Sequence, residues 1–445
     1  MKAVTLVNFV PRLEGETSVP LGPLYIAAVL EKVGCCVDFR DYQTASYGNP
    51  LNQENMIDFF TDSEDTIGIS CLFNVMPFLL PALEKIKAEH PEKTIILGGP
   101  GPSSTAEKLV ERFPFIDVVV KGEGELTAVD LVKGLPYKDV KGIVYNTDGA
   151  VVTTSEQERI RNLDELPFPA YEKVDFSQYD HTGVITARGC PYHCTFCEVA
   201  PLWGHHTEQR SVPNVVAEIK MLYEKYGVTT LHINDDTFVL NRKWVEDFCH
   251  TLKGEGIDIT WRSLGRINLM DRNLLAKMAD AGCIGIQYGI ESGSEAILKR
   301  VDKQITISKM REVIKLSVEY IGQVVTTFMW GFPFETMDDF YQTVYVMGEV
   351  AGMGALVKLL FLSPAPLSPL YKKYCNQLRF DVKFVSNLLW GVFKDTLLPE
   401  EKGEIIKMIL ENPDVFPGFY YVYSPDVEKK YQILKEAGLL HKVGD

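Results

Sequence analysis

Three cysteines stand close together near the middle of this 445-residue chain, in the stretch GCPYHCTFC. They are Cys190, Cys194 and Cys197, and their spacing is C-x-x-x-C-x-x-C. Thiolates are the natural ligands of iron–sulfur clusters, usually four per cluster. Three thiolates on one loop would leave one iron of a 4Fe–4S cube open. That iron could chelate S-adenosylmethionine, and an electron from the cluster could then break a C–S bond to give a 5′-deoxyadenosyl radical.

Two other kinds of site are open to the same residues. Zinc would require four tetrahedral ligands, and His193, His205 or His206 could supply the fourth. A cluster of ferredoxin type, used for electron transfer alone, would require a fourth cysteine near a proline, and none follows. The other six cysteines have irregular spacing, which predicts buried free thiols rather than disulfides. They are Cys35, Cys36, Cys71, Cys249, Cys283 and Cys375.

The elements that must position the cysteines alternate between strand and helix. Six such units begin just before the cysteine motif and predict a partial (β/α)6 barrel, with its active site at the carboxyl ends of the strands. A cysteine loop after the first barrel strand favours the 4Fe–4S interpretation. The predicted strands are Val184–Ala187, Thr230–Asn234, Asp258–Arg262, Ile284–Gly289, Val324–Trp330 and Val357–Phe361.

The first part of the chain also alternates between strand and helix, and it predicts a doubly wound parallel sheet with helices on both faces. Its glycines gather at the carboxyl ends of the strands, where such sheets bind ligands. We therefore expect an α/β chain with four parts. They are the doubly wound domain 1–145, a hairpin and linker 146–180, the partial barrel 181–375, and a small, mostly helical C-terminal region 376–445 that helps to cover the cavity.

Composition narrows the class of protein. The net charge of −15 argues against nucleic acid as a partner. No apolar run approaches the eighteen or so residues of a membrane-spanning helix, so we expect no membrane partner. The N-terminal stretch MKAVTLVNFVP reads as a first strand rather than a signal peptide. We therefore expect a cytoplasmic enzyme in a reducing compartment.

The cysteine motif and several strand ends together resemble the radical S-adenosylmethionine (SAM) superfamily. The resemblance implies that the phenylalanine before the third cysteine contacts adenine. It assigns further SAM contacts to INDDTF, WRSLGRIN, YGIESGS and GFPFET, at the ends of four later strands. The loop LSPAPLSPLY departs from the family, because Leu367 and Ser368 replace the usual G-T. The implied contacts are Phe196, Asp235, Asp236, Arg266, Glu291, Ser292, Gly331 and Pro333.

The N-terminal region resembles the cobalamin-binding domain of one subgroup of that superfamily. The matching stretches are VPLGPLYIAAVLEKVG, IGISCLF, ILGGPGPSS and VVVKGEGE. The motif D-x-H-x-x-G is absent, and the first histidine, His90, lies at a predicted helix end, so we expect no histidine ligand to cobalt. Cys71 ends a strand and could face cobalt, although a core position is favoured. The implied cobalamin contacts are Pro20, Leu21, Gly22, Ser70, Gly98, Gly99, Pro100, Gly122 and Glu123.

The resemblance implies a cobalamin-dependent radical SAM methyltransferase that acts on an unactivated carbon of a small molecule. A reductant such as flavodoxin or ferredoxin would supply the electrons. Three alternatives remain open: a cyclase, oxidase or rearrangement enzyme without net methylation, a non-catalytic corrinoid or iron–sulfur carrier, and a doubly wound domain that binds nothing.

Overall fold

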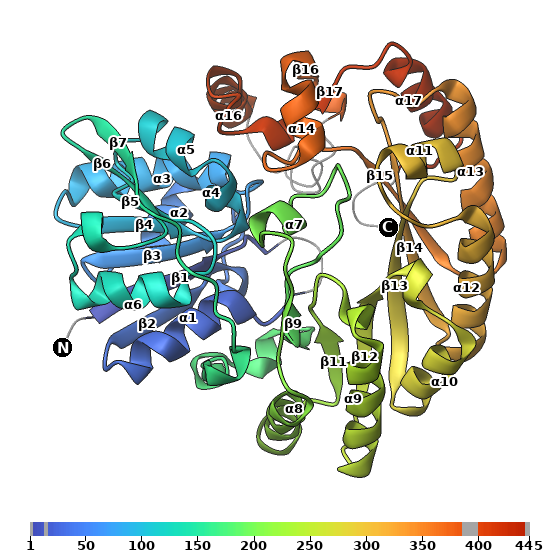
Figure 1. Cartoon of the computed structure of the whole chain (residues 1–445). Helices are drawn as coiled ribbons and strands as arrows, with labels where there is room; N and C mark the ends of the chain where they lie inside the picture. Colours follow the sequence, from blue (N-terminus) through green and yellow to red (C-terminus); the bar gives the residue numbers. More distant parts are fainter. Residues whose placement is uncertain (1–2, 13–16, 385–398, 441–445) are drawn as a thin grey trace.

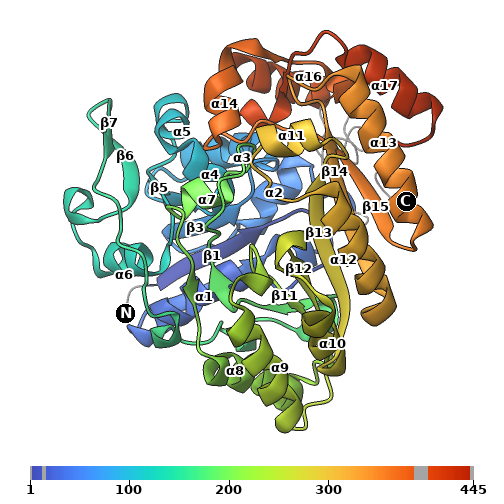
Figure 2. The ribbon, with the colours of Figure 1, turned by 45° about the vertical axis from the view of Figure 1, so that its right-hand side comes forward.

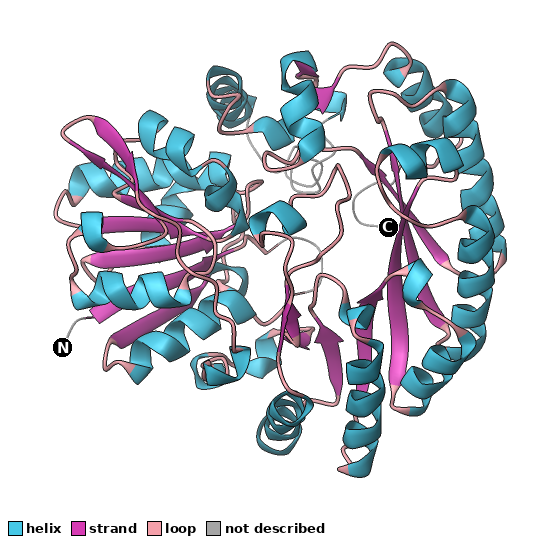
Figure 3. Cartoon of the chain, in the orientation of Figure 1, coloured by secondary structure: helices cyan, strands magenta, loops and turns pink. Residues whose placement is uncertain are grey.

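The computed structural model describes residues 3–12, 17–384 and 399–440. Two sheets with their helices lie side by side, and the last elements of the chain lie across one end of both (Figure 1). Figure 3 shows that helices cover both faces of the first sheet but only the outer face of the second. The predicted fold class, a doubly wound domain followed by a partial barrel, is confirmed.

The first sheet has the strand order β2-β1-β3-β4-β5-β6-β7. Strands β1 to β5 are parallel. Strand β2 is added on one side of β1, and β3 to β5 are added on the other side, as in a doubly wound fold. The predicted hairpin is β6 and β7, which adds two antiparallel strands and carries the sheet past residue 145. The strands are Ala3–Phe9, Cys36–Asp41, Thr66–Cys71, Thr94–Gly98, Val118–Val120, Ile143–Thr147 and Ala150–Thr153.

The helices of this domain form two layers. The contacting pair α1 and α6 packs over Leu6 on one face, and α2, α3 and α5 share the hydrophobic core around Val7 on the other. Leu6 and Val7 are adjacent in β1 and therefore point to opposite faces of the sheet. Both are buried, as expected for a strand covered on both faces. Helices α1 to α6 are Leu21–Lys32, Gln53–Phe59, Met76–Glu89, Pro100–Ser104, Ala106–Arg112 and Glu125–Lys133.

The second sheet is parallel throughout, in the order β15-β14-β13-β12-β11-β8. It curves into an open half-barrel with its helices outside (Figure 2). The strands are Thr182–Val184, Thr230–Ile233, Thr260–Gly265, Cys283–Glu291, Gln323–Trp330 and Leu356–Phe361, for β8 and β11 to β15. The main outer helices are α8 (Val212–Tyr226), α9 (Arg242–Gly254), α10 (Arg272–Asp280), α12 (Ile307–Tyr320) and α13 (Met337–Gly352).

Local signals set several of these boundaries. Asp271 accepts a hydrogen bond from the backbone N–H of Leu274 at 2.9 Å, which caps α10 as the sequence predicts. Helix α8 ends at Gly227, which adopts the left-handed conformation (φ 68°). The first barrel strand was predicted wrongly as Val184–Ala187: β8 ends at Val184, and Ala187–Arg188 forms β9, which pairs with β10 (Glu208–Gln209).

Strand β8 is an edge strand, and the chain on both sides of it is paired. Before it, Ser18 forms a parallel bridge with His181, and the N–H of Val19 donates to the His181 carbonyl at 3.0 Å. After it, the N–H of Arg210 donates to the carbonyl of Thr186 at 2.9 Å. The N-terminal domain therefore contributes directly to the edge of the barrel.

A buried polar network also joins the two domains. Tyr171 of the linker donates to Glu218 of α8 at 2.7 Å, and Arg210 pairs with the same carboxylate. The guanidinium of Arg210 lies 3.4 Å from the hydroxyl of Tyr25, on α1. Burial, followed by the charge of Glu218, raises the pKa of both tyrosines, so their hydroxyls stay protonated hydrogen-bond donors.

The C-terminal elements contact both domains. Ile409 of α16 and Phe416 lie in the hydrophobic core around α3 of the first domain, whereas Val427 and Leu434 of α17 lie in the barrel core. The elements are α14 (Pro369–Tyr374), β16 (Leu378–Arg379), α16 (Pro399–Glu411), β17 (Tyr421–Val422) and α17 (Val427–Glu436). Residues 385–398 and 441–445 of the predicted C-terminal region lie outside the described residues.

Within the described part of the chain, no helix combines the length and the apolar character needed to cross a membrane.

Candidate active site

The three cysteines lie between β9 and the short helix α7 (Val199–Leu202), beyond the end of β8. All three side chains are partly exposed. The N–H of Val199 donates to Cys197 Sγ at 3.4 Å, and Arg266 Nη1 lies 3.8 Å from Cys194 Sγ. Burial raises the pKa of Cys197 to about 11. A bound metal centre would supply the positive charge that holds this thiol as a thiolate.

The donor set fits a multi-iron cluster better than one zinc ion. The three thiols lie on one loop, and they could hold three irons of a cluster and leave the fourth open. Zinc would draw its sulfur ligands to within about 4 Å of one another, whereas the thiolates of a cluster bind different irons. The imidazoles of His193 and His205 stack on each other, with ring centroids 4.2 Å apart.

Asp235 and Asp236, predicted as cofactor contacts, hold the backbone that leads into the cysteine loop. Asp235 accepts from the N–H groups of Thr186 (2.7 Å) and Ala187 (3.0 Å) and from the Thr186 hydroxyl. Asp236 accepts from the N–H of Gly189 at 2.9 Å. Burial raises the pKa of Asp235 to about 6, although these hydrogen bonds lower it. The carboxylate of Asp235 is thus engaged by protein backbone, just before Cys190.

Arg266 brings a buried positive charge to the cysteine loop. Its side chain follows β12, and its guanidinium lies 3.4 Å from the ring centroid of Tyr192, inside the cysteine motif. It donates to the carbonyl of Lys303, and its buried Nε has no partner among the described residues. This cation retains hydrogen-bonding capacity for a carboxylate.

The end of β13 places a second charged group near the motif. Glu291 has φ 71°, in the left-handed region that is strained for a non-glycine residue and is enriched at functional sites. Its carboxylate pairs with Lys303 at 2.7 Å. Lys303 Nζ also lies 5.9 Å from the ring centroid of Phe196, which packs edge-on against Phe332. Ser292 is fully buried, and its hydroxyl bonds to Thr343 at 2.9 Å.

The loop after β14 is held from the far end of the chain. Gly331 has φ 90°, and a Cβ there would lie 2.2 Å from the ring of Phe361. Its N–H donates to Glu335 at 3.0 Å, and Lys430 of α17 donates to the same carboxylate at 3.0 Å. The side chains of this ion pair are completely buried. Pro333 lies between Gly331 and Glu335 in the sequence and is partly buried.

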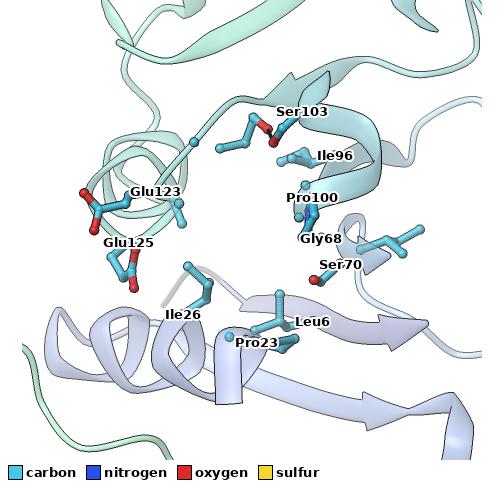
Figure 4. Close-up of a pocket in the computed structure, with 18 of the residues that line it drawn as sticks. Leu6, Pro23, Ile26, Gly68, Ser70, Ile96, Pro100, Ser103, Glu123 and Glu125 are labelled. Carbon is cyan, nitrogen blue, oxygen red and sulfur yellow. Dashed lines mark hydrogen bonds between the residues drawn. The ribbon is translucent and has the colours of Figure 1, made fainter. Parts of the chain in front are cut away.

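A cavity of about 400 Å³ opens at the first sheet. Leu6, Gly68 and Ile96 of the first sheet line it, together with Pro23 and Ile26 of α1 (Figure 4). Seven of the predicted cobalamin contacts line it, namely Gly22, Ser70, Gly98, Gly99, Pro100, Gly122 and Glu123.

Two predicted contacts are not brought to this cavity. Pro20 precedes α1, and Leu21 is buried in the barrel core instead. Cys71 also lies in a core, where burial raises the pKa of its thiol to about 12, so the core position favoured for it is confirmed. The prediction of a buried thiol is wrong for Cys36, which is exposed, and Cys375 is only partly buried. Gly99 has φ 90°, and a Cβ there would lie 2.9 Å from Ser70 Oγ, so this position requires glycine.

The barrel supplies the other wall of the cavity and closes it with a buried ion pair. Arg188, two residues before Cys190, pairs with Glu123 at 2.9 Å and with Glu125 at 2.6 Å. Glu123 is therefore engaged by the barrel, and its second oxygen accepts from the N–H of Ile160 at 2.9 Å. The sequence reasoning missed Arg188, as it missed Lys303 and Lys430, because none of these cations belongs to a motif.

The comparisons with known proteins agree with this geometry. Residues 184–344 match the radical SAM superfamily, and residues 15–132 match the B12 binding domain. An uncharacterised methyltransferase of Pyrococcus horikoshii is 30% identical over 75% of this chain and 74% of its own. Cytidylyl-2-hydroxyethylphosphonate methyltransferase of Streptomyces wedmorensis is 26% identical over 71% of this chain and 69% of its own. The anaerobic magnesium-protoporphyrin IX monomethyl ester cyclase of Cereibacter sphaeroides is 25% identical over 88% of this chain and 66% of its own.

Two solved structures share the fold. The radical SAM methyltransferase TsrM of Kitasatospora setae aligns over 99% of this chain and 89% of its own, with a TM-score of 0.72 and 17% identity. The cobalamin-dependent radical enzyme OxsB aligns over 100% of this chain and 77% of its own, with a TM-score of 0.70 and 19% identity. The chain belongs to the radical SAM superfamily, in the branch whose members also carry a B12 binding domain.

Proposed function

We propose that this enzyme methylates an unactivated carbon of a small molecule, using SAM, a 4Fe–4S cluster and cobalamin. One observation carries the proposal. Ala187 and Arg188, which lead into the cysteine loop, line the cavity of the first sheet, and so does Asp236, which accepts a hydrogen bond from Gly189 in that loop. The two cofactor sites thus share a wall, and a substrate between the domains would reach both.

When bound, the cluster supplies the electron that cleaves SAM to a 5′-deoxyadenosyl radical, and cobalamin supplies the methyl group. The chain's own residues would bind the cluster and SAM and orient them. Cys190, Cys194 and Cys197 would hold three irons. Arg266, with its unused Nε, would pair with the SAM carboxylate, and Glu291 would accept from the ribose hydroxyls.

The aromatic and glycine contacts complete the SAM site in this proposal. Phe196 presents a partly buried ring beside the cysteines, suited to the face of adenine. Gly331, fixed by Glu335, lets backbone approach the adenosine closely because it has no side chain. Asp235 and Asp236 act as positioning residues, since they bind the backbone before Cys190.

The first domain offers the shape that a corrinoid requires. Gly98, Gly99 and Gly122 would let the backbone approach a broad flat ring, and the apolar slot behind them would take its planar tail. No histidine is among the residues that line the described cavity. We therefore propose that cobalt takes no histidine ligand from this domain.

The cyclase interpretation stays as the second candidate, because a cyclase aligns over 88% of this chain. The two candidates use the same cofactors and differ in the product. A methyltransferase adds the mass of one methyl in place of hydrogen, whereas a cyclase oxidises or rearranges. A reducing cytoplasm and a small reductant such as flavodoxin or ferredoxin suit either candidate, since an exposed thiol loop must stay reduced.

The test is anaerobic reconstitution with iron, sulfide and hydroxocobalamin, followed by desalting, a visible spectrum and a dithionite assay for 5′-deoxyadenosine. We expect the wild type to retain corrinoid and to form 5′-deoxyadenosine. Cys194→Ala should lose at least 100-fold of the product, whereas Cys36→Ala, at an exposed thiol outside the site, should retain it. A fully loaded protein that forms no 5′-deoxyadenosine, even with candidate substrates, would point to the carrier instead.

A further inference from the structure

A second, smaller cavity of about 110 Å³ lies where the two domains meet the C-terminal region. We name it the Glu198 cavity. Phe73 and Thr105 come from the first domain, Glu198 follows Cys197 directly, and Pro364 and Pro417 come from the loop after β15 and the C-terminal region. Residues of both domains and of the C-terminal region therefore line this cavity.

Two buried polar atoms of this cavity have no partner among the described residues. They are Glu198 Oε2 and the hydroxyl of Thr105, a side chain that is 7% exposed. The carboxylate of Glu198 is held in place by the backbone N–H of Leu367. Leaving a buried acceptor unsatisfied costs about 1–3 kcal/mol, and more for a charged group. Two such atoms in one cavity make it a candidate binding site for a group that donates hydrogen bonds.

The residues that line the Glu198 cavity favour one kind of ligand. Pro364, Pro366 and Pro417 carry no N–H, and the hydroxyl of Ser363 already donates to the Gly418 carbonyl at 2.9 Å. Among the described residues, no lysine, arginine or histidine lines the cavity, so these residues offer an anion no countercharge. A carboxylate among proline and aromatic walls favours a hydrogen-bond donor with positive charge. The volume holds about four heavy atoms, judged from about 30 Å³ for each water.

We propose that the Glu198 cavity binds the ammonium group of an amine-bearing substrate. The carboxylate of Glu198 and the hydroxyl of Thr105 accept its N–H groups, and the apolar walls contact the adjoining carbons. This proposal rests on the proposed function, since it places the anchor beside the cysteine loop. The side-chain amides of a bound corrinoid share the N–H chemistry and are the rival occupant.

The test measures binding of ethylammonium to the reconstituted, cobalamin-loaded protein by saturation-transfer NMR, with ethanol and acetate as neutral and anionic probes of similar size. We expect ethylammonium to bind in the millimolar range and acetate not to bind. Glu198→Gln and Thr105→Val should each weaken ethylammonium binding at least fivefold. Glu158→Gln, at an exposed carboxylate, is the matched control and should leave binding unchanged.

Other outcomes overturn the proposal. Equal signals from the three probes, or unchanged binding in both variants, would leave only water in the cavity. Ethylammonium binding that appears only without cobalamin, together with lower corrinoid retention in Glu198→Gln, would assign the cavity to a corrin amide. The 5′-deoxyadenosine assay on the same samples separates failure of this proposal from failure of the proposed function, because that product does not depend on ethylammonium.

Discussion

The buried ion pair between Lys430 and Glu335 allows a quantitative test of how α17 is fixed to the barrel. Both side chains are completely buried. Lys430→Met would leave the carboxylate of Glu335 buried without its countercharge, which typically costs about 3–5 kcal/mol. Glu335→Gln/Lys430→Met removes both charges, and we expect it to recover most of that loss, because neutral replacement of a buried pair is often tolerated.

The assay is urea unfolding of the cofactor-free protein, followed by tryptophan fluorescence. A loss of 3–5 kcal/mol should lower the midpoint of the C-terminal transition by about 1 M or more. Lys429→Met is the matched control, since Lys429 is the exposed neighbour on the same helix. If Lys430→Met unfolds within 1 kcal/mol of Lys429→Met, the pair contributes no stability and the argument from burial is wrong.

The pH dependence adds a second check with a definite sign. Burial raises the pKa of Glu335, and Lys430 lowers it. A carboxyl group whose pKa is higher in the folded state stabilises the fold below its unfolded pKa, and this stability is lost as the pH rises through the folded value. Removing the lysine raises the folded pKa further. The defect of Lys430→Met should therefore be larger at pH 8 than at pH 5, and the opposite trend would contradict it.

Three more predictions concern the loops around the cofactor sites. Arg188→Met would remove the cation that pairs with two buried carboxylates in the cavity wall, so corrinoid retained after desalting should fall at least tenfold, whereas Arg161→Met, at an arginine that is 70% exposed, should retain it. Burial raises the pKa of Asp235 from 3.8 to about 6, so between pH 4 and pH 7 the wild type should lose about 2 kcal/mol of unfolding free energy relative to Asp235→Asn; a parallel pH profile would refute this. Gly331→Ala should weaken SAM binding in equilibrium dialysis at least tenfold, because its Cβ meets an aromatic ring, whereas Gly322→Ala, also at positive φ but in open space, should bind SAM normally.

The sequence was sufficient for chemistry that is encoded in contiguous motifs. The three cysteines, and the strand-end positions of Arg266 and Glu291, could be found because alternating strands and helices bring successive strand ends to one rim. The family match at residues 15–132 and 184–344 agrees with that reasoning.

The sequence was not sufficient where partners come from distant parts of the chain. Lys430 and Glu335 are separated by 95 positions, and Arg188 and Glu123 by 65. A single lysine belongs to no periodic sequence pattern, so the sequence alone predicts that it is exposed. Its burial follows only when the folded structure shows the carboxylate that pairs with it. The same limit explains the end of β8, because the carboxylate of Asp235 draws Thr186 and Ala187 away from the strand pairing that their apolar neighbours suggested.

The pairing beside β8 has a consequence for how the chain can be divided. An edge strand of a parallel sheet presents unpaired N–H and C=O groups that can recruit a second copy of the same sheet. In this chain the bridge between Ser18 and His181 brings the N-terminal domain against the start of that edge. Separating the barrel from the N-terminal domain would expose this edge to self-association. The N-terminal domain thus covers part of this edge, and the two domains are best expressed as one undivided chain.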